Sequence, residues 1–298
     1  MSLASAYKII RPSVVAIAAR GSTRPDFPLI IGTGVIVDAD GYILTNDHVL
    51  EALVRLPRRP GAPPEEWPGM VLLFHLIPEK GMATIPLEIV GVAKLGMNPV
   101  PENYYGGQPD LGIIHVGQVK GLPAAKIGPA DLPVGSDIGI LGFPMGTDTL
   151  AAPGWIHQVT PTLQRGIISA QLPYECEAPH ELMIDAVIEG GASGSPVFDA
   201  SNGQVVGLVY GGLGDIREIQ VGEGVIPYTA PTSHTLAVSN FFVRRALDQF
   251  QQSAPRESAD ELAKRTDFQD YLTRATVRMM TPRDTTSGMM RPVEPPAD

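Results

Sequence analysis

The most informative stretch of the sequence is Gly190-Gly191-Ala192-Ser193-Gly194-Ser195-Pro196, which lies between two short apolar runs. Small residues around Ser193 let another molecule approach its hydroxyl, and they let the N–H groups of Gly191 and Ser193 converge on one point. Two converging N–H groups are what an oxyanion hole requires. A plain Gly/Ser turn in a hairpin is the alternative interpretation of the same residues.

A histidine follows a predicted hairpin upstream of this stretch. The apolar run Gly32–Val37 leads through a turn into the strand Tyr42–Thr45, after which His48 follows. A side chain at the end of a strand lies at the rim of a barrel and not in its core. A lone histidine is usually structural. Beside a reactive serine it becomes a candidate base, because a serine hydroxyl is a poor nucleophile until its proton is removed.

The third expected group is a carboxylate that fixes the tautomer of the imidazole. Asp110 directly precedes the apolar strand Leu111–Val116, so the pattern predicts an acid at a sheet edge, although an aspartate before a strand is commonly a turn residue. The chain order His48, Asp110, Ser193 differs from that of α/β-hydrolases, in which the serine comes first. Esterase chemistry on that scaffold is therefore disfavoured.

The composition of the 298 residues points to many short strands, because 32 Gly and 29 Pro favour tight turns over long helices. A formal net charge of -10 would repel a phosphate backbone, so no nucleic acid partner is expected. The single cysteine, Cys176, cannot form an intrachain disulfide, and no group of His, Cys and Asp has zinc-binding spacing. The sequence therefore predicts no metal and no cofactor.

Short apolar runs bounded by Gly, Pro and Asp predict an all-β fold of two six-stranded antiparallel β-barrels, about 1–125 and 126–235. A 3.6-residue period predicts a C-terminal helix over 236–251, which completes a domain of residues 1–252. The extension 253–298 is expected to be helical over 258–280 and disordered beyond. The predicted strands are 14–19, 29–37, 42–45, 70–77, 85–93, 111–116, 138–141, 156–169, 182–184, 196–199, 205–210 and 224–230.

The start of the chain carries no recognisable targeting signal. The longest apolar run there, Val14–Ala19, is far shorter than the roughly 18 residues of a membrane span, and no secretory pattern precedes it. The sequence therefore predicts no membrane span and a cytoplasmic location, with a periplasmic or secreted location if a leader has been removed.

Together these segments resemble the chymotrypsin-fold (trypsin-like) serine proteases, and among them the HtrA/DegP-like peptidases, here without a PDZ domain. The resemblance extends from about Tyr7 to Phe250. Two residues depart from the family pattern, since Ala192 replaces the usual Asn and Ser195 replaces the second Gly. The matching segments are Gly32-Thr33-Gly34, Asp40-Gly41-Tyr42, Thr45 to Val49, Asp110 to Ile114, Gly142-Phe143-Pro144 and Asp185 to Pro196.

The resemblance implies a serine endopeptidase that acts on polypeptides. It makes Ser193 the nucleophile, His48 the base and Asp110 the residue that orients His48, with the amides of Gly191 and Ser193 as the oxyanion hole. Trimeric relatives use an N-terminal extension, which is short here, so a monomer is favoured over an oligomer, which is the alternative. The alternative is a latent or inactive protease-fold binding module, which Ala192 and the insertions before Asp110 would favour.

The resemblance also implies a substrate pocket. The position six residues before the nucleophile holds Val187, so the acid that would select Arg or Lys is absent. The expected preference is a small apolar residue before the scissile bond. His234 in a nearby loop is an alternative that would favour an acidic residue. The predicted pocket residues are Val187, Val209, Tyr210, Gly211 and Ala230.

Overall fold

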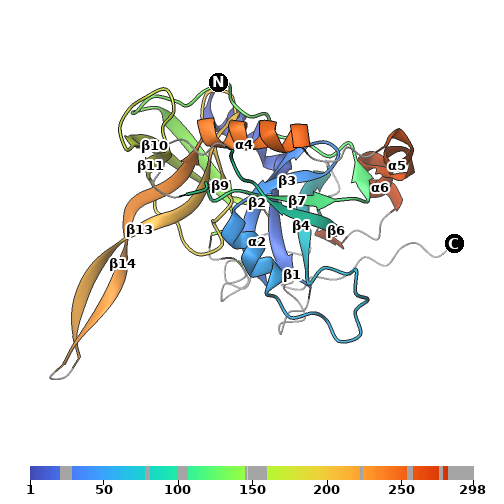
Figure 1. Cartoon of the computed structure of the whole chain (residues 1–298), viewed down its shortest axis with the longest axis horizontal. Coiled ribbons are helices and arrows are strands. Elements are labelled where there is room, and N and C mark those ends of the chain that lie inside the picture. Colours follow the sequence, from blue (N-terminus) through green and yellow to red (C-terminus); the bar gives the residue numbers. More distant parts are fainter. Residues whose placement is uncertain are drawn as a thin grey trace.

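The computed structural model describes residues 1–20, 29–77, 81–98, 107–144, 146, 160–221, 224–253, 258–274 and 278–280. The disorder predicted after Met280 and the predicted strand residues 156–159 lie outside these ranges. Within them, no helix is long and apolar enough to cross a membrane. The chain forms two antiparallel β-sheets that lie side by side (Figure 1). The predicted all-β fold of the chymotrypsin type is confirmed.

Over the described residues the first sheet is an open sheet of eight strands in the order β16-β5-β4-β1-β2-β3-β7-β6, two strands more than in the six-stranded barrel predicted here. One reason is that the predicted strand 85–93 is divided between β5 and β6, and the other is that β16 from the C-terminal extension pairs with β5. The strands are β1 (Val14–Ala19), β2 (Ile30–Asp38), β3 (Tyr42–Thr45), β4 (Gly69–Ile77), β5 (Gly81–Leu87), β6 (Ile89–Lys94), β7 (Gly112–Val116) and β16 (Arg278–Met280).

The second sheet is a closed six-stranded barrel in the order β10-β11-β14-β13-β12-β9, as predicted. It closes because β9 pairs with both β10 and β12. Its strands are β9 (Asp137–Gly142), β10 (Thr162–Leu172), β11 (Glu181–Asp185), β12 (Pro196–Asp199), β13 (Val205–Val221) and β14 (Gly224–Ser239).

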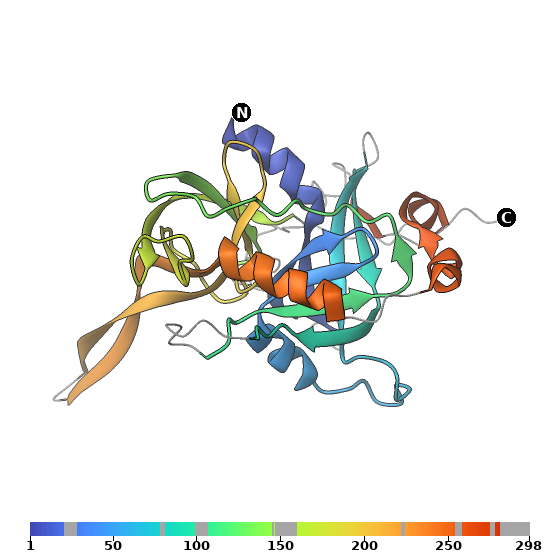
Figure 2. The same ribbon diagram turned by 45° about the horizontal axis from the view of Figure 1, so that its top comes forward.

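Two strands of this barrel are far longer than predicted. The sequence predicts strands over 205–210 and 224–230 only. In the structure, β13 and β14 stay paired from Gly207 opposite Ser239 to Val221 opposite Gly224. Their distal halves project from the barrel as a two-stranded ribbon, which is orange and yellow in Figure 1 and is seen again from another angle in Figure 2. We call the ribbon formed by residues 213–221 and 224–230 the arm.

The helices lie at the outside of the sheets. The predicted helix 236–251 begins later, at Asn240, because residues 236–239 complete β14, while the predicted helix 258–280 is broken into α5, β15 and α6. The first helix, α1, was not predicted. The helices and the short parallel strand pair are α1 (Leu3–Ile10), the 3-10 turn η1 (Arg11–Ser13), α2 (Asp47–Val54), α4 (Asn240–Ser253), α5 (Ala259–Lys264), α6 (Phe268–Arg274), β8 (Val119–Lys120) and β15 (Thr266–Asp267).

One hydrophobic cluster joins the two sheets. Val35 of the first sheet belongs to the same buried cluster as Phe198 and Leu208 of the barrel and Phe242 of α4. The C-terminal segment is also held to the first sheet, since Phe268 is 2% exposed within that sheet's own core. Because burial of this kind of surface is the main stabilising term, the sheets are expected to form one stable unit with a fixed boundary between them.

Candidate active site

His48 lies in the first turn of α2 and not at the tip of a strand. β3 ends at Thr45, and the helix begins at Asp47 and buries Val49 and Leu53 against the first sheet. His48 is therefore on the outward side of the helix, where its side chain is 47% exposed. His48 is therefore exposed and outside the core, but it is carried by a helix and not by the end of a strand.

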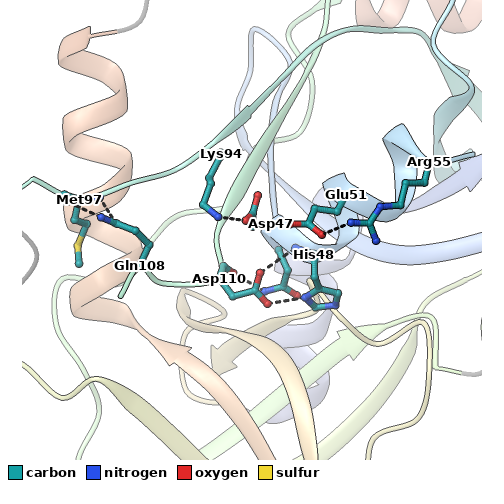
Figure 3. Close-up of polar contacts among 9 residues, drawn as sticks. Asp47, His48, Glu51, Arg55, Lys94, Met97, Gln108 and Asp110 are labelled. Atoms are coloured by element: carbon teal, nitrogen blue, oxygen red, sulfur yellow. Dashed lines mark hydrogen bonds and ion pairs between the residues drawn. The ribbon is translucent and has the colours of Figure 1, made fainter. Parts of the chain in front are cut away.

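Asp110 contacts His48 twice. Its Oδ2 lies 2.6 Å from His48 Nδ1, and its Oδ1 accepts a hydrogen bond of 3.0 Å from the His48 backbone N–H (Figure 3). The position of Asp110 is fixed in turn by Asn46, whose side-chain amide donates to the Asp110 carbonyl at 2.8 Å. Both carboxylate oxygens are thus used to orient one histidine.

The contact shifts the pKa values of both groups. The side-chain hydrogen bond with Asp110 raises the pKa of His48 above its ordinary value of 6.5, against the opposing effect of burial. Burial acts to raise the pKa of Asp110, but the hydrogen bonds with His48 outweigh it, so the pKa of Asp110 lies below its ordinary value of 3.8. The pair is therefore built to stabilise a protonated imidazole.

Two further acids lie on the same helix (Figure 3). Asp47 forms an ion pair with Lys94, and Glu51 pairs with Arg55 at 3.0 Å. The Asp47 hydrogen bond raises the pKa of Lys94. Because each acid has its own cation, Asp110 is the carboxylate that is left to engage His48 directly.

The loop with Ser193 connects β11 and β12 of the barrel, yet it is bound to the first sheet. The Thr33 N–H donates to the Ser193 carbonyl at 2.8 Å. A Cβ placed on Gly32 would lie 2.7 Å from the Val49 side chain and 3.4 Å from the Ser193 carbonyl oxygen. One glycine of β2 therefore separates the helix of His48 from the Ser193 loop, and its missing side chain allows the close approach.

A single buried threonine shapes the loop around the two predicted oxyanion donors. Thr33 Oγ1 donates to the Gly191 carbonyl at 2.9 Å and accepts from the Phe143 N–H at 3.1 Å. Gly191 has a φ of +92°, which favours glycine. Within the described residues, the N–H groups of Gly191 and Ser193 donate to no protein acceptor. Both donors are thus available for a bound oxygen.

A cavity of about 360 Å³ opens beside Ser193. Of the five predicted pocket residues, only Gly211 lines it, whereas Val209 is fully buried and Val187 is 44% exposed elsewhere. His234, the alternative considered from the sequence, does line the cavity. The lining consists of Ile188, Glu189, Gly190 and Ser193, of Gly211 to Gly214 from β13, and of Thr229, Pro231, Thr232 and His234 from β14.

Sequence reasoning missed most of this lining. Tyr210 and Ala230 were predicted and are not among the lining residues, while Glu189 was not predicted. The available signal was proximity, because Glu189 lies next to the glycine pair before Ser193. In the described part of the chain, no cluster of three or more His, Cys, Asp or Glu side chains is placed to hold a metal ion.

The two sheets, with Asp110 and His48 on one and the serine loop of the other beside them, define the chymotrypsin-fold class of proteins. The family model of the trypsin-like peptidase domain matches residues 32–208, which is more than half of the chain. The chain therefore belongs to the trypsin-like peptidase family.

The curated relatives that the chain matches are named as serine endoproteases. The chain is 30% identical over 186 residues to a probable periplasmic serine endoprotease, DegP-like, of Ectopseudomonas mendocina, and 31% identical over 186 residues to the protein of the same name in Pseudomonas fluorescens. Each match covers 60% of this chain and 28% of the relative. The chain thus matches little more than a quarter of the length of these relatives.

Solved structures show the same fold at low sequence identity. An HtrA-type protease variant with a tripeptide superposes with a TM-score of 0.51 and 19% identity, covering 85% of this chain and 64% of that one. The same variant with a decapeptide gives a TM-score of 0.51 and 17% identity, covering 86% of this chain and 68% of that one. These likenesses establish the architecture.

Proposed function

We propose that the chain is a serine endopeptidase in which Ser193 attacks a peptide carbonyl. The contact between Asp110 and His48 is the observation that carries the proposal. When Nδ1 of His48 holds the proton that it donates to Asp110, Nε2 is left as the proton acceptor. That tautomer is the one that a general base beside a serine requires.

The proposed reaction has two halves. Ser193 Oγ forms a bond to the carbonyl carbon while its proton passes to His48 Nε2, and the carbonyl oxygen becomes an oxyanion that accepts from the N–H groups of Gly191 and Ser193. The C–N bond then breaks, and His48 gives its proton to the departing amine. Water attacks the acyl-enzyme by the same route and regenerates the Ser193 hydroxyl.

The cavity supports a preference for a small, apolar residue before the scissile bond. Its walls include Ile188 and four consecutive backbone positions from Gly211 to Gly214, three of which are glycines. Glu189 and His234 are the polar groups that could change this preference. The test compares the cleavage of peptides with valine or glutamate at this position by wild type and by His234→Ala. If wild type cleaves the glutamate peptide faster and His234→Ala does not, the enzyme prefers an acidic residue through His234.

The location of the protein is part of the proposal. The comparisons do not support the predicted cytoplasmic location, because the curated relatives are named as periplasmic. We propose that this chain is also located in the periplasm. The monomeric state stays a prediction.

The decisive experiment is labelling with a fluorophosphonate probe, which reacts only with an activated serine. We expect wild type to be labelled at Ser193 and both Ser193→Ala and His48→Ala to lose the label. Ser195→Ala is the matched control, because it removes a serine hydroxyl two residues away that is fully buried. Folded wild-type protein that stays unlabelled would instead favour the latent protease or the binding module.

A further inference from the structure

Lys94 lies beside the candidate active site but takes no part in the proposed reaction. It is the last residue of β6, where it pairs with Gly112 of β7, two positions after Asp110. A Cβ on Gly112 would clash with the Leu50 side chain, so its absence lets α2 pack closely over β7. This packing brings the first turn of α2 to the end of β6, where the Lys94 ammonium donates a hydrogen bond to the Asp47 carboxylate (Figure 3).

The two charges of this ion pair are exposed to different extents. The side chain of Lys94 is 57% exposed, whereas that of Asp47 is only 15% exposed. A carboxylate that has lost most of its contact with water is strongly destabilising unless a cation is paired with it. Lys94 supplies that cation from a strand that lies next to the strand of Asp110.

The acid of this pair is the neighbour of the proposed base in the sequence. After the hydrogen bond with Asp110, the charge of Asp47 is a further cause that raises the pKa of His48. Glu51, one turn further along the same helix, acts in the same direction. Without Lys94, the nearly buried Asp47 carboxylate would have the adjacent imidazole as its source of positive charge. It would then favour the protonated form of His48, which cannot accept a proton from a serine.

The titratable groups around the base come from both sheets. On the first sheet and its helix they are Asp110, Asp47, Glu51, Arg55 and Lys94, and from the second barrel Glu189 and His234 line the cavity beside Ser193. The hydrogen bond with Asp47 raises the pKa of Lys94, and so do the charges of the other two acids on the first sheet and its helix. Lys94 is therefore a constant positive charge at the pH values at which His48 titrates.

We propose that Lys94 is a positioning residue: it holds the Asp47 carboxylate in an ion pair and so leaves the control of the proposed base to Asp110. The inference rests on the proposed function and deepens it, because it adds a residue that acts on the base through another side chain. Its consequence is that His48 stays neutral, and the reaction proceeds, at a lower pH than it would without Lys94.

The first measurement needs no activity. NMR titration of the Cε1–H signals of the six histidines in Ser193→Ala protein gives the pKa of His48, whose signal is identified by its loss in His48→Gln. We expect Lys94→Met to raise this pKa by about 0.5, which is roughly a threefold change in the protonation constant. Lys94→Arg keeps the charge and a donor for Asp47, so it should return the pKa to the parent value. An unchanged pKa in Lys94→Met would overturn the proposal.

Two further variants separate the ion pair from a general effect of charge. Arg55→Met removes the same charge from the partner of Glu51, whose side chain is 54% exposed and remains solvated without a cation. Its shift should be less than half of the shift in Lys94→Met. Adding Asp47→Asn to Lys94→Met should restore the parent pKa, because the acid that the lysine holds is gone. Equal shifts in the two single variants, or a double variant that keeps the full shift, would overturn the proposal.

Peptide hydrolysis connects this result to the reaction. With Ser193 intact and a valine p-nitroanilide peptide as substrate, Lys94→Met should move the acid limb of the kcat/KM profile to higher pH by about 0.5. A lower plateau with an unmoved limb is the signature of a structural role and would overturn the proposal. If the NMR shift is found but no peptide is cleaved, the proposed function is wrong, whereas the control of His48 by the ion pair is supported.

Discussion

The two sides of the candidate active site are built in different ways. On the His48 side, the groups belong to the first sheet and its helix, and they are bonded to each other. On the Ser193 side, the loop belongs to the second barrel but takes its shape from Thr33 of the first sheet. The conformation of the serine loop therefore depends on how the two sheets pack, whereas the geometry of the histidine and aspartate pair depends on one sheet alone.

The largest expected effect comes from the His48 side. Asp110→Asn keeps the shape of the side chain but removes the charge and replaces one of the two acceptor oxygens that orient His48 by an NH2 donor. We expect kcat to fall by about 10⁴, as is typical when this acid is replaced in such a triad. Peptide hydrolysis measured above pH 8 tests the fall, and a loss of less than tenfold would show that Asp110 does not orient the base.

The same variant has a pH signature. His48 must be neutral to accept a proton, so activity rises with pH as His48 loses its proton, above its ordinary pKa of 6.5. Without Asp110 the pKa of His48 falls, and the acid limb of the kcat/KM profile moves to lower pH. Asp47→Asn is the control, since Asp47 raises the pKa of His48 only through its charge and should shift the limb less.

The next effect tests the Ser193 side. In Gly191→Ala, the added Cβ would lie 2.4 Å from the Phe143 carbonyl oxygen at a φ of +92°, so the loop must move and its N–H leaves the oxyanion position. Loss of one such donor lowers kcat by roughly 10² to 10³. Gly190→Ala is the neighbouring control, because a Cβ there meets no atom within 4 Å. Equal losses in the two variants would argue against a role for the Gly191 N–H.

Local sequence patterns were enough to select His48 and Asp110, which the structure places in contact, and Ser193, whose carbonyl is bonded to the first sheet. His48, Asp110 and Ser193 stand next to strand ends, and strand ends can be located from short apolar runs and turn residues. The functional roles of these residues stay predictions. The N-terminal helix was not predicted, since the first expected element was the strand 14–19. Its buried residues Ala6 and Ile10 are four positions apart, which is a helical spacing.

The arm shows what local patterns cannot supply. Gly211 and Gly212 were interpreted as the end of a strand, but the register shifts there are bulges, which continue the strand with a bend. β14 also contains Pro227 and Pro231, and it pairs with β11 only from His234 onward. Proline is tolerated on an open edge, where its missing N–H has no partner to lose. The residues that line the cavity could not be predicted for the same reason, because segments that are distant in the sequence form the lining.

A smaller effect is expected from the residue that joins the two sides. Thr33→Val removes the hydroxyl that bonds to both Gly191 and Phe143, at a stability loss of about 1 to 3 kcal/mol. We expect kcat to fall about tenfold with KM nearly constant, because the hydroxyl positions the oxyanion loop and does not touch the substrate. Thr33→Ser restores the hydroxyl and should recover kcat. A Ser variant as slow as the Val variant would mean that packing, not the hydrogen bond, shapes the loop.

The smallest expected effect concerns Ser195, which departs from the usual glycine of the family. Its side chain is fully buried, and its hydroxyl has no hydrogen-bond partner among the described residues. Such a hydroxyl is destabilising, so Ser195→Ala should raise the free energy of unfolding by up to about 1 kcal/mol and leave the oxyanion loop unchanged. Urea denaturation of the two proteins measures the difference. A less stable alanine variant would reveal that the hydroxyl is paired in solution, and the serine would then be a further link between the loop and the barrel.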